Sequence, residues 1–183
     1  YQLSDNENEL NKVLDSQNYI TNHNAINMEQ LASATKLVAS QAASSGVGID
    51  EMTAAVGTMS ATTQQAGEVS GRAFKGILMN LQQVKGAAED IGDGGEDITE
   101  ESLSKYEKAS EALGVSLKEI KNGTLQLRDP MEVLRDLAKE VEKEGESSLK
   151  VANLVAAIGG KYRGNSLIAL LRNWDTYEKM LSE

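Results

Sequence analysis

The sequence contains no cysteine, and it has only one proline, one histidine, one tryptophan and one phenylalanine. Without cysteine, the chain can form neither disulfide bonds nor cysteine-ligated metal sites, and its redox compartment stays undetermined. Aromatic residues make up only 4% of the chain, so aliphatic side chains, methionine and alanine have to supply the core. We therefore expect a lean core around which helices pack at short distances.

An excess of basic residues and a long apolar run are also absent. The chain carries 18 Lys and Arg against 28 Asp and Glu, which gives a net charge of -10. Proteins bind nucleic acid backbones through basic surfaces, so we expect no direct nucleic acid binding. No apolar run approaches the roughly 18 residues of a membrane span, and the sequence therefore gives no support for membrane contact.

Apolar residues recur at helical spacing through most of the chain. Their positions predict an all-α fold, a bundle of about eight short helices with one small two-stranded β-hairpin at about 115–128. The expected helices cover residues 10–20, 28–42, 52–59, 69–84, 103–113, 131–141, 151–158 and 167–181. A capping box of Asn27 and Gln30, an N-cap at Asp129 followed by Pro130, and caps at Thr99 and at Ser147 or Ser148 mark helix starts.

The length of 183 residues suits one domain. The chain starts with Tyr1 and ends directly after a helical pattern, so we expect residues 1–183 to be one helical domain cut from a longer protein. An acidic, glycine-rich segment at 87–99 is a candidate hinge between 1–86 and 100–183.

The acidic segment at 87–99 and the residues after it partly match the pattern of a calcium-binding EF-hand loop. Counting from Asp90, Gly95 matches the glycine and Glu101 the twelfth-position acid of an EF-hand loop. However, Gly92 and Gly94 occupy the third and fifth positions, which should supply oxygen ligands. A solvated loop is therefore the favoured interpretation over a metal site, and ion binding there stays open.

The segment KEIKNGTLQLRDP, from Lys118 to Pro130, predicts the hairpin. Asn-Gly accepts the positive φ angles of a type I′ turn, and a two-residue loop pairs Ile120 with Leu125. Strict pairing puts Leu117 and Leu127 on opposite faces, so we predict a bulge that places Lys118 and Glu119 opposite Gln126. Because an isolated hairpin is marginally stable in water, we also expect its apolar side to lie on helices.

A search for catalytic groups finds no candidate catalytic, cofactor-binding or metal-binding residue. His23, the single imidazole, lies in a polar TNHN segment and is interpreted as a surface or capping residue. GEVSG at 67–71 is not G-x-S-x-G and falls within a helical pattern. GGKY at 159–162 lacks the first Gly and the Ser or Thr of a phosphate-binding loop, so it is interpreted as a helix-terminating glycine pair.

Six consecutive segments together resemble one known family. They are SSGVGIDEM, TTQQAGEV and GRAFKGILMNL within 25–86, then LSKYEKASEALGVSLKE at 103–119, NGTLQLRDPMEVLRDLAKE at 122–140 and AAIGGKYRGNSLIALLRNWDTYEKML at 156–181. In this order and spacing they are similar to the conserved core region of tail tape measure proteins of long-tailed bacteriophages or prophages. Lys161 and Gly164 depart from the family pattern in the last segment.

The resemblance implies a structural virion protein and no enzyme. Tape measure proteins set tail length while tube subunits polymerise around them, and they leave the tail ahead of the DNA. It implies tail tube and tail-assembly proteins as partners, with self-association left open, no cofactor, and a location in the virion tail after synthesis in the host cytoplasm. The alternative is a bacterial helical adaptor that binds a partner through a groove near the hairpin, and a metal- or nucleotide-dependent enzyme is the least favoured class.

Overall fold

The computed structural model describes residues 10, 11, 14, 15, 17, 18, 27–84, 104–145 and 147–182. These residues form helices and one two-stranded antiparallel hairpin, which confirms the predicted fold class. The helices are α2 (Met28–Ser44), α3 (Ile49–Thr63), α4 (Gly67–Leu81), α5 (Lys105–Glu111), α6 (Pro130–Glu144), α7 (Leu149–Leu154), α8 (Gly160–Arg172) and α9 (Trp174–Ser182), with a π-helical segment η2 (Val155–Gly159) before α8. The strands are β1 (Lys118–Lys121) and β2 (Thr124–Leu127).

Three helix starts follow the predicted capping residues. The Asn27 side chain accepts a hydrogen bond from the backbone N–H of Gln30 at 2.8 Å, and both halves of the capping box are present. Asp129 accepts from the N–H groups of Met131 and Glu132 at the start of α6. Ser148 caps α7. Each cap satisfies N–H groups that a helix start leaves without a partner.

Two predicted helix boundaries are wrong. Helix α5 is capped by Ser104, whose N–H donates to Glu107 Oε2 at 2.7 Å, and not by Thr99, which lies outside the described residues. Ser104 has the glutamate three residues later that completes a capping box, and Thr99 does not. The expected last helix is divided into α8 and α9 at Asn173, whose Nδ2 donates to Ala169 O at 2.8 Å and so competes with helix continuation.

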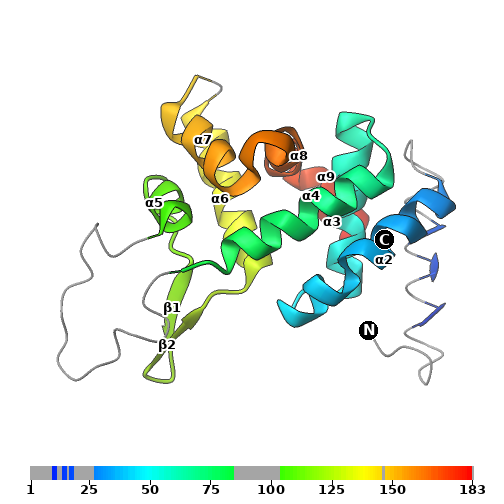
Figure 1. The fold of residues 1–183 in the computed structure, drawn as a ribbon, viewed down its shortest axis with the longest axis horizontal. Helices are drawn as coiled ribbons and strands as arrows, with labels where there is room; N and C mark the ends of the chain where they lie inside the picture. The colour runs from blue at the N-terminus through cyan, green and yellow to red at the C-terminus, as the bar shows by residue number, and fades with distance from the viewer. Residues whose placement is uncertain are drawn as a thin grey trace.

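Helix α4 runs through the middle of the molecule (Figure 1). Helix α2 packs along it, and α3, α8 and η2 also contact it, while α9 packs on α3. Segments from the two ends of the chain are therefore neighbours in one hydrophobic core. The side chains of Phe74, Leu31, Met52, Ile77 and Leu134 are among the largest that are fully buried there.

Glycines allow the helices to approach closely at three places. A Cβ added at Gly71 would lie 3.0 Å from the Ala34 Cα, and one added at Gly159 would lie 2.7 Å from the Gly164 Cα. A Cβ at Gly76 would collide with the guanidinium of Arg163. Close by, Asn80 Nδ2 donates to the carbonyl of Ile158 at 2.7 Å. These contacts confirm the expected short distances between helices.

Helix α6 has a buried side and a solvent-exposed side. Met131, Leu134, Ala138 and Val141 are all at most 4% exposed. On the solvent-exposed side, Lys143 Nζ lies 2.6 Å from Glu140 Oε1, and Lys139 Nζ lies 3.8 Å from Asp136 Oδ1. Since exposed pairs of this kind stabilise by only about 0.2–0.5 kcal/mol each, packing of the apolar stripe holds α6 in place.

Candidate interaction surface at the hairpin

The hairpin has a regular ladder, so the predicted bulge is wrong. Ile120 pairs with Leu125, as expected, but Lys118 pairs with Leu127 and Glu119 with Gln126. Asn122 and Gly123 have φ angles of 54° and 77°, which fit the predicted type I′ turn. The bulge was expected in order to bring Leu117 and Leu127 to one side, and the structure does not require this.

Leu117 and Leu127 have separate roles. Leu117 precedes β1, is 1% exposed and belongs to the core. Its carbonyl accepts from the N–H of Arg128 at 3.0 Å, which closes the base of the hairpin. Leu127 is 39% exposed and shares a face with Ile120, which is 77% exposed, and with the half-buried Leu125.

The expectation that this apolar side lies on helices is wrong for Ile120, near the turn, whereas Leu127 lines a pocket with the ends of α2 and α4. We call Ile120, Leu125 and Leu127 the hairpin face. In Figure 1 the turn of the hairpin points away from the helices. Ile120 and Leu127 are exposed on this face beside the half-buried Leu125, and neighbouring exposed apolar side chains are common where proteins contact other molecules.

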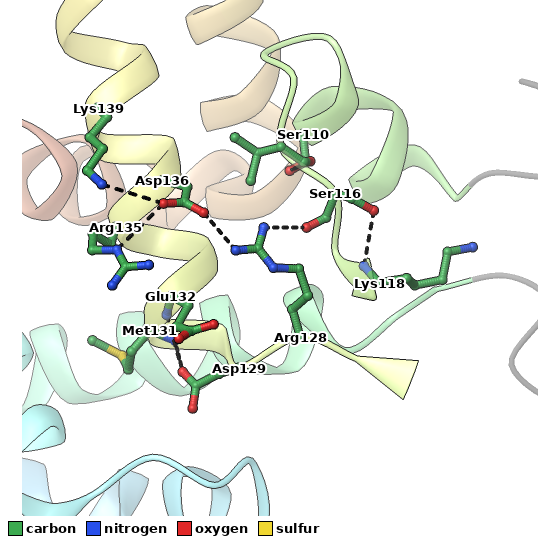
Figure 2. Close-up of polar contacts among 11 residues, drawn as sticks. Ser110, Ser116, Lys118, Arg128, Asp129, Met131, Glu132, Arg135, Asp136 and Lys139 are labelled. Atoms are coloured by element: carbon green, nitrogen blue, oxygen red, sulfur yellow. Dashed lines mark hydrogen bonds and ion pairs between the residues drawn. The ribbon is translucent and has the colours of Figure 1, made fainter. Parts of the chain in front are cut away.

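Arg128 joins the hairpin to α6 (Figure 2). Its Nη2 lies 2.7 Å from Asp136 Oδ2, and its Nη1 donates to the carbonyl of Ser116 at 3.1 Å. The hydrogen bond from Arg128 lowers the pKa of the Asp136 carboxyl, and the charges of Arg128, Arg135 and Lys139 act in the same direction. Arg135 Nε also lies 3.5 Å from Asp136 Oδ1.

A buried ion pair joins the other strand to α5. Lys118 Nζ lies 2.7 Å from Glu107 Oε1, with side chains 11% and 1% exposed. Glu107 also completes the cap of α5 through Ser104. In the last turn of α5, Ser110 Oγ donates to the carbonyl of Val115 at 2.5 Å and holds the segment that leads into β1. The base of the hairpin is thus fixed by Lys118 at the start of β1 and by Arg128 directly after β2, while its tip makes no such ion pairs among the described residues.

No catalytic arrangement is found in the part of the chain that the structure describes. Ser70 is buried in α4 and its Oγ accepts from Ser60 Oγ at 2.9 Å, so it contributes to helix packing. Gly159 ends η2 and Gly160 has a φ of 65°, as expected for a terminating glycine pair. His23 and the acidic segment at 87–99, with Asp90 and Glu101, lie outside the described residues.

The described residues also include no group of three or more His, Asp or Glu side chains that could hold a metal ion. Among them, no helix combines the length and the apolar character needed to cross a bilayer. A pocket of about 240 Å³ lies beside the hairpin, between the end of α2, the end of α4 and the segment from Leu127 to Pro130. This pocket is the closest counterpart of the groove that the adaptor hypothesis requires.

Sequence reasoning missed the exposure of the hairpin face, although the signal was present. With a two-residue turn, strict pairing already assigns Ile120, Leu125 and Leu127 to one side and Leu117 to the other. The assumption that every large apolar residue of a hairpin is buried led to the predicted bulge. The residues that fix the base, Lys118 and Arg128, gave no such signal because their partners lie in other elements.

Comparison with known proteins supports the resemblance seen in the sequence. A family described as phage-related minor tail protein matches residues 1–160, which include α2 to α7, η2 and the hairpin. The segment 161–181, which also resembles tape measure proteins, lies beyond that match. No curated protein and no solved structure matches the chain. Since the match covers most of the 183 residues, the chain belongs to the phage-related minor tail protein family.

Proposed function

We propose that the chain is a folded module of a tail tape measure protein from a phage or prophage, and that it acts in tail assembly and tail-length determination. The family match over residues 1–160 is the observation that carries this proposal. The helical fold agrees with it, because an α-helix advances about 1.5 Å per residue and so converts chain length into distance. In this proposal the compact module is part of the longer chain, and the extended remainder is the ruler.

The proposed role is structural and involves no catalysis. Support comes from the family match to minor tail proteins and from the serine and glycine contacts of α4, which serve packing. The net charge of -10 supports a chain that avoids DNA during genome passage. Tight DNA binding at physiological salt, measured by filter binding, would contradict that part of the proposal.

Electron microscopy of tails tests the proposal. We expect that deletion of codons 27–182 from the parent gene leaves few or no assembled tails, and that the intact gene supplied in trans restores them. If instead the tails shortened by about 1.5 Å for every deleted residue, this segment would be the ruler itself. Normal tails after the deletion would favour the adaptor hypothesis, as would absence of the chain from purified particles in mass spectrometry.

The hairpin face supports a contact with an extended segment of another tail protein. Within the described residues the sheet has only two strands, so each strand offers an edge to which a further strand can add. Ile120 provides the most exposed apolar side chain of this face. We expect Ile120→Asp to lower the yield of tails without unfolding the chain.

Leu149 at the start of α7 provides a matched control for that experiment. It is 79% exposed, close to the 77% of Ile120, but it lies outside the hairpin face. Leu149→Asp should therefore leave the tail yield unchanged. Equal yields from the two variants would exclude the hairpin face as the contact site.

A further inference from the structure

A second surface, separate from the hairpin face, has the character of a binding pocket. A cavity of about 330 Å³ lies where the first turns of α3 and α6 meet α9. Four carboxylates line it: Glu51 of α3, Asp129 and Glu132 at the start of α6, and Glu178 of α9. We call this cavity the acidic pocket. Nothing in the sequence pattern predicted it, because its residues come from three separate parts of the chain.

Each of three carboxylates in the acidic pocket keeps one oxygen without a hydrogen bond among the described residues. Glu51 Oε2 accepts from the N–H of Gly48 at 2.8 Å, Asp129 Oδ1 accepts from two N–H groups, and Glu178 Oε1 accepts from Trp174 Nε1 at 3.1 Å. The other oxygens have no such contact. Burial raises the pKa of Glu51, and the negative charge of Asp129 acts in the same direction.

Tyr177 is the second, independent sign of a ligand. Its side chain is only 3% exposed and lines the acidic pocket, yet its hydroxyl has no hydrogen-bond partner in the described structure. Burial raises the pKa of this phenol, and the charges of Glu51, Asp129 and Glu178 add to the effect. Tyr177 therefore lines the pocket together with three carboxylates whose negative charge acts on its phenol. The hydroxyl oxygen itself keeps some contact with solvent, so it is accessible to a ligand that enters the pocket.

The pocket has more acidic than basic residues in its lining, with four carboxylates and one guanidinium. Arg135 is the one basic residue that lines it, and its Nε lies 3.5 Å from Asp136, outside the cavity. The carboxylates do not converge tightly enough for a metal ion, since no group of three among the described residues could hold one. The site thus suits a cation that is larger than a metal ion and that can reach several carboxylates at once.

Aromatic and apolar groups complete the pocket. The rings of Trp174 and Tyr177 lie 4.4 Å apart at an interplanar angle of 40°. Met131 and Leu181 add apolar walls. A planar guanidinium can stack on an aromatic ring while its five N–H donors reach carboxylates on different sides, and its aliphatic stem can contact the apolar walls.

We propose that the acidic pocket binds the guanidinium of an arginine side chain presented by a partner protein. The guanidinium donates to the open oxygens of Glu51, Asp129 and Glu178 and to the Tyr177 hydroxyl. Its planar shape favours arginine over lysine. This inference goes beyond the proposed tail function, because it concerns a different surface and holds whether or not the hairpin face binds a tail protein.

Trp174 allows a direct test, because it is the only tryptophan in the sequence and lines the pocket. The purified chain is titrated with Nα-acetyl-arginine amide at constant ionic strength while the indole N–H resonance of Trp174 is followed by NMR. The matched control ligand is Nα-acetyl-citrulline amide, which has nearly the same shape but no charge. We expect a saturable shift with the arginine compound and none with citrulline.

Three results of that titration would overturn the proposal. The first is no shift of the Trp174 resonance with the arginine compound. The second is an equal shift with citrulline, which would show that charge is not recognised. The third is an equal shift with calcium chloride at the same concentration, which would make the pocket a site for a simple cation.

Pocket variants give a second test. Tyr177→Phe keeps the ring and removes the hydroxyl, so it should weaken binding by roughly threefold to tenfold, the effect of one hydrogen bond. Glu132→Gln, at an exposed pocket position, should weaken binding by roughly twofold to threefold. The matched control is Glu111→Gln, which makes the same change of charge on the exposed end of α5.

The control variant should bind like the unchanged chain. Circular dichroism shows whether Tyr177→Phe still folds, and Glu132→Gln keeps the test valid if it does not, because that side chain is exposed. Unchanged affinity in the Glu132 variant and in a folded Tyr177 variant would refute the assignment of the pocket.

Discussion

Phe74 in α4 and Ile120 in β1 are both large apolar side chains, yet Phe74 is 0% exposed and Ile120 is 77% exposed. Phe74 lies in a core where glycines let the helices approach closely. Ile120 lies on a hairpin whose base is fixed by Lys118 and Arg128 and whose face is open. The difference shows that apolar burial stabilises the helical body, whereas ion pairs position the hairpin and leave its apolar surface available.

Removal of the Phe74 ring should produce the largest effect. Phe74→Ala should lower the free energy of unfolding by about 3–5 kcal/mol, because it loses buried apolar surface and leaves a cavity. Urea unfolding followed by circular dichroism measures this. Val69→Ala in the same helix is the control, since Val69 is 42% exposed and should change stability by less than about 0.5 kcal/mol. Similar losses in the two variants would remove the distinction between core and surface.

The ion pair at the base of the hairpin should have the next largest effect. Lys118→Ala leaves the buried Glu107 carboxylate without its cation, which should cost about 3 kcal/mol in unfolding free energy. Lys121→Ala, at an exposed position of the same strand, should change stability by less than about 0.5 kcal/mol. If Lys118→Ala lowered the free energy of unfolding no more than Lys121→Ala, packing and not the ion pair would position the hairpin.

A smaller, pH-dependent effect is expected at Asp136. The pKa of Asp136 is lowered in the folded state. Its carboxylate therefore stabilises the fold at pH values above the unfolded-state pKa of about 3.9. This stabilisation is lost as the pH falls through the lower pKa of the folded state. Asp136→Asn should therefore cost about 1 kcal/mol at pH 7, since the pair with Arg128 is partly exposed.

The cost of Asp136→Asn should shrink as the pH drops below about 3.9, when the parent carboxyl is also neutral. Chemical unfolding at pH 7 and at acid pH measures the change. Glu142→Gln, on the same helix and exposed, is the control and should show no such pH-dependent difference. A constant cost at both pH values would mean that the charge of Asp136 does not stabilise the fold.

The smallest effect on stability is expected on the hairpin face. Ile120→Ser should change the free energy of unfolding by less than about 0.5 kcal/mol, because the side chain makes few contacts to lose. Thermal unfolding of the variant beside the parent chain measures this. A loss above about 2 kcal/mol would show that Ile120 supports the fold and would argue against an open contact surface.

Local features of this fold were predictable from the sequence, and contacts between distant residues were not. The caps at Asn27 and Asp129 and the turn at Asn122 depend on a few neighbouring residues, so the sequence carries them directly. The break at Asn173 was missed because the apolar spacing continues across it. Whether Leu127 is buried depends on what surrounds the hairpin, and the local pattern contains no such information.

The acidic pocket and the ion pair of Lys118 show the same limit more strongly. Glu51, Asp129 and Tyr177 are far apart in the sequence, and each has an ordinary local reason for its place, as a helix cap or as part of an apolar stripe. Only the tertiary arrangement of α3, α6 and α9 brings them to one pocket. Single-sequence reasoning identified the family through ordered blocks of residues, but it could not assign residues to either surface.

The contact of Gly76 with Arg163 couples two positions on α4 and α8. Any larger residue at 76 needs the space that the guanidinium occupies, so the arginine would have to move or be replaced at the same time. One turn away, the hydrogen bond from Asn80 to Ile158 links the same two regions. In an alignment of related tail proteins, positions 76 and 163 should therefore vary together, with a small residue at 76 wherever arginine is kept at 163.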